Sequence, residues 1–202
     1  MVSVSSVRPA RVDARQNRAH ILEIAGRAFA ENSVDLSMDS IARMAGVGSG
    51  TLYRHFANKD ALLVALLAPH HDRLEQERAA IEAEESDAAR ILERWIDALG
   101  DWMLAYDGLS EPLRSAWSAN RSPLKTTCQA LVETTDRLLR SAQRAGLARP
   151  NLSGQDIFLG ALAVAWACGR ATAHDATRAA LHSVFRSGWI LDAHETPSRD
   201  DR

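Results

Sequence analysis

Hydrophobic residues recur at intervals of three and four along most of the chain, which is the spacing of amphipathic helices. The first stripe follows Ala14 and consists of Ile21, Leu22, Ala25, Ala28 and Phe29. Asn32 can end this helix, because asparagine tolerates the left-handed backbone conformation. The pattern predicts a helix over residues 14–32, preceded by an arm over residues 1–13 that lacks helical periodicity and that we expect to be flexible.

Two short helices are predicted next. Ser37 is the expected N-cap of the first, which ends at Gly46, and the second runs from Ser49 to Phe56. At about 100° per residue, Leu52 and Phe56 share one side of the second helix. The opposite arc carries Gly50, Thr51, Tyr53, Arg54 and His55. Two short helices joined by a glycine-containing turn form a helix-turn-helix.

The rest of the chain reads as six further helices. Asn58 caps a long helix from Lys59 towards Glu85, and Pro69 within it predicts a kink or break near Ala68. The remaining segments are a stripe from Leu92 to Tyr106, a short helix capped by Ser110, a helix that starts at Ser122-Pro123 and ends at Gly146, one opened by a Ser153/Asp156 capping box, and one from Asp175 or Thr177 to Gly188. We therefore expect an all-α fold of about nine helices.

Charge is distributed unevenly, although the formal net charge of the 202 residues is only -2. Residues 1–59 contain eight basic and five acidic side chains, whereas the remainder contains 16 and 21. This balance excludes a polycation that coats nucleic acid by charge alone. In the arm, Arg8, Arg11, Arg15 and Arg18 either follow a minor groove or are simply solvated.

The residues that could indicate other classes of protein do not form a site in the sequence. Cys128 and Cys168 lie in apolar runs, as small buried hydrophobes do in a reducing compartment. His70 and His71 point about 100° apart on a helix, and no further histidine or cysteine lies one turn away from either. We expect no metal, no cofactor and no enzymatic activity. Without a long apolar span or a signal peptide, the expected location is the cytoplasm, with no membrane partner.

The polar arc of the second short helix suits DNA. Its hydroxyl groups and Arg54 can reach phosphates or base edges in a major groove, while Gly50 lets the helix approach the groove floor. Lys59 and the free N–H groups of its helix N-terminus offer a second anion site. The alternative is a helical module whose head recognises protein and whose binding tolerates salt.

The segment SMDSIARMAGVGSGTLYRHFANKDALL resembles the signature of the TetR family of transcriptional regulators, and the resemblance covers about residues 15–67. It implies an all-α dimer with an N-terminal DNA-binding head and a C-terminal body that binds a small molecule. The DNA contacts that it suggests are Ser37, Ser40, Ser49, Gly50, Thr51, Tyr53, Arg54, His55 and Lys59. Asp39 suits a helix N-terminus better than DNA.

The expected domains are a helix-turn-helix unit over residues 14–58, a ligand-binding and dimerisation body over residues 59–194, and a flexible tail over residues 195–202. The expected function is a repressor that binds a palindromic operator as a homodimer and is released by a small, partly hydrophobic effector. The sequence names neither the operator nor the effector.

The body is rich in aromatic and sulfur-containing side chains, which either form core or line an apolar pocket with a few polar groups. The candidate ligand-binding residues are His70, Trp95, Leu99, Trp102, Met103, Tyr106, Trp117, Thr127, Cys128, Phe158 and Trp166.

The eighth helix has two apolar faces. One contains Ile157, Ala161 and Val164, and the other Phe158, Leu162 and Trp166. Since a helix that is apolar all round is buried all round, we expect the eighth and ninth helices of two chains to form a four-helix dimer seam.

Overall fold

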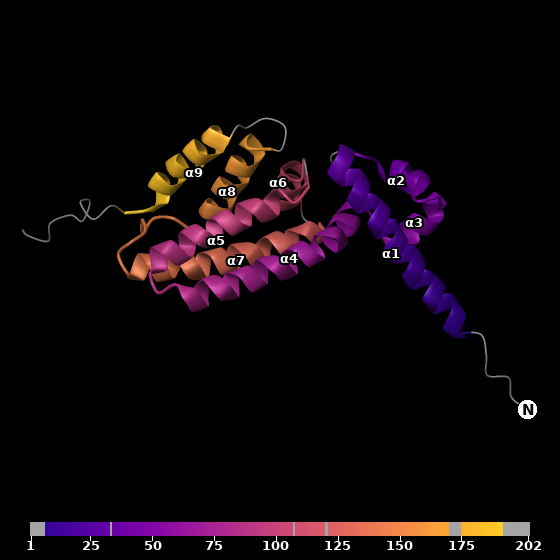
Figure 1. Ribbon diagram of the computed structural model, residues 1–202, viewed down its shortest axis with the longest axis horizontal. Coiled ribbons are helices and arrows are strands. Elements are labelled where there is room, and N and C mark those ends of the chain that lie inside the picture. The colour runs from indigo at the N-terminus through magenta and orange to yellow at the C-terminus, as the bar shows by residue number, and fades with distance from the viewer. Residues whose placement is uncertain (1–6, 33, 107, 120, 170–174, 192–202) are drawn as a thin grey trace, which may run out of the picture.

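The computed structural model describes residues 7–32, 34–106, 108–119, 121–169 and 175–191. These residues form nine α-helices and no strand beyond one isolated antiparallel bridge, which confirms the all-α prediction (Figure 1). The helices are α1 (Val7–Asn32), α2 (Met38–Met44), α3 (Ser49–His55), α4 (Lys59–Glu84), α5 (Ala88–Met103), α6 (Ser110–Ser118), α7 (Pro123–Arg144), α8 (Gly154–Ala167) and α9 (Asp175–Trp189). The predicted tail, residues 195–202, and residues 1–6 lie outside this description.

Helix α1 begins at Val7, seven residues before the start that the hydrophobic pattern predicted. Residues 13–20 are exposed, so this part of the helix carries no apolar stripe from which it could be recognised. Pro9 is compatible with a first turn, whose N–H groups have no partners within the helix. The expectation of an irregular arm is therefore wrong for residues 7–13.

Helix α4 connects the head, formed by α1 to α3, to the body, formed by α5 to α9 (Figure 1). Leu62 and Leu63 are fully buried near its start, and Leu74 and Ile81 are buried further along. The helix continues through Pro69, so the predicted break does not occur, and the alternative of a kink stays a prediction. Pro69 is itself exposed, and buried leucines hold the helix on both sides of it.

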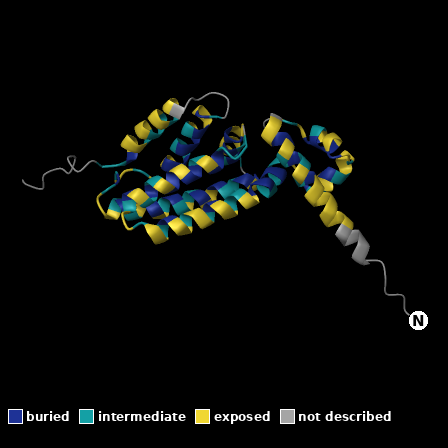
Figure 2. Ribbon diagram, viewed as in Figure 1, coloured by how far each residue is buried: buried dark blue, intermediate teal, exposed yellow. Residues whose placement is uncertain are grey.

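The body is a bundle in which α5 packs against α4, α7 and α8, while α7 also packs against α8. Buried residues of α5, α7 and α8 alternate with exposed ones along each helix (Figure 2). Trp95 of α5 is fully buried and its Nε1–H donates to Thr135 Oγ1 of α7 over 2.9 Å. The Thr135 hydroxyl in turn donates to the carbonyl of Leu131 over 2.7 Å. This pair satisfies the polar groups at the α5–α7 contact.

Helix α5 ends at Met103, so the prediction that it reaches Tyr106 is wrong. Residues 104–106 form a turn that leads to Gly108, whose φ of 74° favours glycine. The apolar stripe continues into this turn because Tyr106 packs on residues of α1 and α4. A periodic stripe records burial, and here the burial continues after the helix has ended.

Most predicted helix ends are confirmed. Ser37, Asn58 and Ser122 cap α2, α4 and α7, and the Ser153/Asp156 capping box opens α8. Ser110 is not a cap, because α6 has Leu109 as its N-cap and Ser110 as its first residue.

Helix α9 is fixed at its C-terminal end. The amide of Arg149 donates to the carbonyl of Trp189 over 2.9 Å, and the amide of Leu191 donates to that of Leu147 over 3.0 Å. The Trp189 side chain is only 2% exposed. These contacts join the end of α9 to the loop between α7 and α8.

The Trp95–Thr135 hydrogen bond gives a first test of this packing. Thr135→Val keeps the shape of the side chain but leaves the buried indole N–H unpaired, which costs about 1–3 kcal/mol of unfolding free energy. Thr135→Ser keeps the hydroxyl and loses one methyl group, so we expect it to cost about 0.8 kcal/mol and less than Thr135→Val. Urea unfolding measures both, and equal losses in the two variants would contradict the role assigned to the hydrogen bond.

Candidate DNA-binding site

Helix α3 is held in place from behind by two buried side chains. Leu52 is fully buried and Phe56 is 2% exposed, as the sequence pattern predicted. The turn before α3 is a Schellman motif at the end of α2, in which Gly46 has a φ of 65°. The amide of Val47 donates to the carbonyl of Ala42 over 3.0 Å, and the amide of Gly46 to that of Arg43 over 3.1 Å. These bonds fix the angle between the two helices.

The opposite side of α3 faces solvent. Gly50 and Arg54 are exposed, Tyr53 is 46% exposed, and Thr51 and His55 are half-buried. The Arg54 guanidinium lies along the helix, where Nε donates to the Gly50 carbonyl over 3.0 Å and Nη2 to the Thr51 hydroxyl over 3.4 Å. The other N–H groups of the fork remain available to an acceptor outside the chain.

Helix α2 contributes a cluster of hydroxyl and charged side chains next to α3. The Ser37 hydroxyl accepts from the Ser40 amide over 3.1 Å, and the Ser40 hydroxyl accepts from Arg43 Nη2 over 3.1 Å. The Ser49 hydroxyl donates to Asp39 Oδ1 over 2.9 Å. Asp39 thus lies in the first turn of α2, as predicted, but it also holds the first residue of α3.

Arg43 is a residue of this surface that the sequence reasoning missed. It is exposed in the last turn of α2, on the polar side of that helix. The only signal in the sequence was a basic residue opposite the stripe formed by Met38, Ile41 and Ala42.

Lys59 lies at the start of α4, whose N-cap Asn58 accepts from the amide of Ala61 over 2.8 Å. Lys59 is half-buried, and its neighbour Asp60 accepts a 2.6 Å hydrogen bond from the Ser122 hydroxyl at the start of α7. The start of α4, next to the head, is therefore joined directly to α7 of the body.

The arginines of α1 are described only in part. Arg8 and Arg11 lie where no side chains are described, whereas Arg15 and Arg18 are exposed. The Arg18 guanidinium lies 4.9 Å from the ring centroid of Phe56. This cation–π contact places one arm arginine beside α3.

The helix-turn-helix geometry agrees with the comparisons to known proteins. Residues 21–66 match the family model of bacterial regulatory proteins of the tetR family, and residues 87–189 match that of the SbtR-like transcriptional regulator C-terminal domain. The chain belongs to the TetR family. Members of this family are DNA-binding transcription factors and not enzymes.

Individual TetR relatives match to different extents. A TetR transcriptional regulator from Streptomyces coelicolor is 30% identical, with a TM-score of 0.55 over 87% of this chain and 99% of its own. A putative TetR-family regulator from Rhodococcus sp. is 22% identical, with a TM-score of 0.58 over 86% and 96%, and shows the shared fold. An HTH-type transcriptional regulator of Staphylococcus aureus strain USA300 is 51% identical over 53 residues. That match spans 26% of this chain and 29% of the relative.

The candidate ligand-binding residues are spread over several environments in this TetR protein. Six are buried in the core, namely Trp95, Leu99, Trp102, Met103, Cys128 and Phe158. His70, Tyr106, Trp117 and Thr127 are half-buried, and Trp166 is 71% exposed. Burial raises the pKa of the Cys128 thiol to about 12, so this cysteine is a neutral core residue. The Trp102 indole N–H is buried without a hydrogen-bond partner in the described part of the chain.

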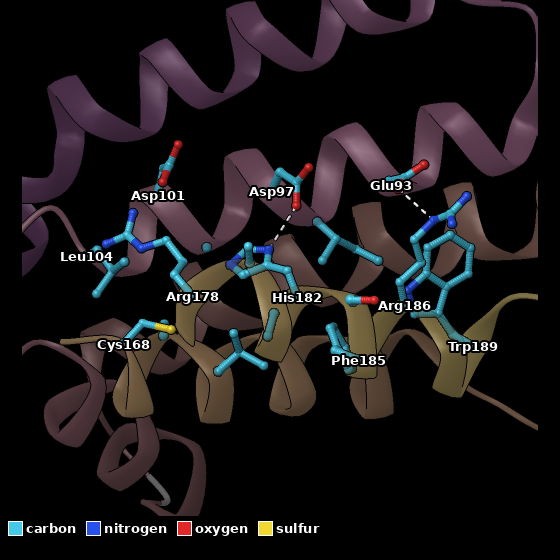
Figure 3. Close-up of a pocket in the computed structure, with 17 residues that line it drawn as sticks. Glu93, Asp97, Asp101, Leu104, Cys168, Arg178, His182, Phe185, Arg186 and Trp189 are labelled. Carbon is cyan, nitrogen blue, oxygen red and sulfur yellow. Dashed lines mark hydrogen bonds and ion pairs between the residues drawn. The ribbon is translucent and has the colours of Figure 1, made fainter. Parts of the chain in front are cut away.

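None of these eleven residues lines a cavity of about 460 Å³ that lies between α5, α8 and α9 (Figure 3). The sequence reasoning missed this cavity because its lining is shared among three helices, and the small residues that leave the space, such as Gly100, Ala161 and Ala165, have no distinctive pattern. Helix by helix, they are indistinguishable from ordinary core.

None of the helices in the described ranges is long and apolar enough to cross a membrane.

The size of Gly50 provides a test of how α3 meets DNA. A Cβ atom built on Gly50 has no neighbour within 4 Å, so the fold itself does not require glycine there. We expect Gly50→Leu to keep or raise the melting temperature, because leucine favours a helix by up to about 1 kcal/mol over glycine. Its DNA affinity should fall at least tenfold, because the side chain holds α3 off the groove floor.

Gly50→Ala serves as the matched smaller change, with an intermediate loss of affinity. Calorimetric melting and fluorescence anisotropy on selected DNA fragments measure the two effects separately. Full DNA affinity in the leucine variant would contradict a close approach of α3 at this residue.

Proposed function

We propose that the protein is a homodimeric repressor that binds a palindromic operator through α3 and is released by a small, partly hydrophobic effector. The observation that carries this proposal is the exposed polar side of α3, held from behind by buried Leu52 and Phe56. The proposed DNA contacts are the nine residues suggested by the family resemblance, together with Arg43. Residues 14–58 would form the DNA-binding unit, and residues 59–194 the effector-binding and dimerisation unit.

Dimerisation through α8 and α9 is supported by two exposed apolar side chains. Trp166 of α8 and Val184 of α9 are each 71% exposed. Phe158 and Leu162 are buried within the chain itself, so the second apolar face of α8 is only partly available to a partner. Because Phe158 and Leu162 are not available to a partner, the proposed seam is limited to the end of α8 that carries Trp166 and to the outer side of α9.

A dimer is needed because a single α3 offers few contacts. Helix α3 comprises seven residues, about two turns. Two such helices about 34–36 Å apart read two half-sites one turn of B-DNA apart. Their contacts to the two halves of a palindrome then contribute to a single binding event.

The ring contacts of Tyr106 support a coupling between body and head. Its ring meets those of Phe29 in α1 and His70 in α4 edge to face, with centroid distances of 6.3 and 5.5 Å. Burial raises the pKa of Tyr106 and is the main cause that lowers that of His70, so this joint is neutral and partly desolvated. An effector that moves the loop after α5 would shift α1, with a coupling of about 1–3 kcal/mol.

Arg54 gives the test of DNA binding. We expect Arg54→Ala to weaken binding to selected DNA by about 1–3 kcal/mol and to flatten the dependence of log affinity on log salt concentration. Arg94→Ala is the matched control, because Arg94 pairs with Glu84 on the body over 3.0 Å. Fluorescence anisotropy over a salt series measures both variants.

If the head recognises protein instead of DNA, we expect the opposite result for Arg54→Ala. Arg54→Ala would then leave DNA retention unchanged, and the binding of the wild-type protein to DNA would not fall steeply with salt. Unchanged affinity in a folded Arg54→Ala protein would therefore overturn the DNA-binding role of this side chain.

Val184 gives the test of the dimer seam. We expect Val184→Asp to convert the dimer to monomer, since a charge within an apolar seam loses its water without gaining a partner. The fold of the monomer should be unaffected, because the side chain is exposed. Ala80→Asp on the exposed side of α4 is the matched control. Sedimentation velocity measures the mass, and a dimeric Val184→Asp protein would exclude this seam.

A further inference from the structure

The cavity between α5, α8 and α9 has the size and lining of a small-molecule site. Its volume of about 460 Å³ lies within the range of about 300–1,000 Å³ that is usual for ligand pockets. Gly100 of α5 lines the cavity without a side chain, and a Cβ built there would lie 4.0 Å from His182 Cε1, an ordinary van der Waals distance. The apolar part of its lining consists of Ile96, Leu104, Ala161, Val164, Ala165, Cys168, Phe185 and Trp189.

Three acidic residues of α5 and three basic residues of α9 line the same cavity at intervals of four residues (Figure 3). Two of these three acid–base pairs are in contact. Arg186 Nε lies 2.6 Å from Glu93 Oε1, and His182 Nδ1 lies 3.1 Å from Asp97 Oδ1. By the same register Asp101 faces Arg178, yet neither side chain has a hydrogen-bond or ion-pair partner among the described residues.

The two side chains of the open pair differ in their need for a partner. Asp101 is exposed, so water can solvate its carboxylate. Arg178 is half-buried and lies at the same end of the cavity as Leu104 and Cys168 (Figure 3). A partly desolvated guanidinium is best satisfied by a planar anion, and a carboxylate matches its fork of N–H groups.

We propose that this cavity binds a small amphipathic carboxylic acid, whose carboxylate pairs with Arg178 and whose apolar body lies on Ala161, Ala165 and Phe185. Arg186 and His182 do not compete with Arg178 for the carboxylate, because they already pair with Glu93 and Asp97. Asp101, which faces Arg178 without an ion pair, is the acidic group beside which the ligand's carboxylate must lie. This site is separate from the aromatic residues of the body considered above.

A ligand bound in this cavity can affect both the head and the dimer seam. Helix α9 is tied down at Trp189, so a ligand at Arg178 acts on its opposite end and thereby on Val184. On the other side, Leu104 lines the cavity and is two residues from Tyr106, which packs on Phe29 of α1. The regulatory part of this inference rests on the proposed function, whereas the binding itself does not.

Titration calorimetry of the full-length protein with octanoate, in the absence of DNA, tests the site. We expect saturable binding at one octanoate per chain, with 1-octanol and octylammonium as uncharged and cationic probes of equal length. Arg178→Met should weaken octanoate binding at least about tenfold, the loss of one charge-assisted hydrogen bond, and leave octanol binding nearly unchanged. Arg94→Met is the matched control and should bind octanoate like the wild type.

A second variant fills the cavity without changing its charge. Gly100→Leu should reduce the binding of both octanoate and octanol, and its melting temperature shows that the bundle is intact. The proposal is overturned if octanoate does not bind saturably, if Arg178→Met retains full affinity, or if octylammonium binds more tightly than octanoate.

Release of DNA is measured separately, on fragments that the protein selects from a random pool. Octanoate that binds at Arg178 without weakening DNA binding would refute its effector role while leaving the site in place. Loss of DNA binding in the ligand-free protein would count against the proposed regulator alone.

Discussion

Helix α4 packs in both the head and the body, and the arrangement of the rest of the molecule depends on this double packing. Its buried leucines near the start complete the core of the head, and Leu74 and Ile81 further along pack in the body. Most buried residues of head and body, including Leu62, Leu63 and Leu74 of α4, form one continuous apolar cluster. Because packed interiors have few voids and low compressibility, we expect a displacement in the body to reach the head as a shift of packed side chains.

The head uses its limited number of residues to keep α3 fixed and exposed. Burial of Leu52 and Phe56 contributes about 1.5–3 kcal/mol each to the stability of the folded head. This contribution is enough to hold α3 in place, a helix of two turns that would not form in isolation. The Schellman turn and the Ser49–Asp39 hydrogen bond set its orientation. The polar side chains opposite are exposed or half-buried. Their exposure leaves them accessible for the DNA contacts proposed above.

The sequence predicts most of this fold, because periodic burial and capping are local properties. Caps such as Ser37, Asn58 and the Ser153/Asp156 box satisfy helix ends with residues three positions away, and the structure has them as predicted. The predictions of helix ends that are wrong depend on packing between helices or on its absence, which a local pattern does not contain. The exposed start of α1 has no apolar face, and the stripe that ends at Tyr106 reflects contacts with α1 and α4 that no local pattern contains.

Of the two candidate sites, one could be predicted from a local pattern and the other could not. The polar arc of α3 follows from angles within one short helix, whereas the cavity depends on three helices and on the register between α5 and α9. An inventory of aromatic residues predicts where apolar surface is abundant, but a ligand site also needs unfilled space. Large side chains such as Trp95 and Phe158 fill the interior of the bundle, whereas Gly100, Ala161 and Ala165 leave the gap under α9. Space for a ligand thus arises where the residues are small, and the charged side chains of α5 and α9 determine which ligand can enter it.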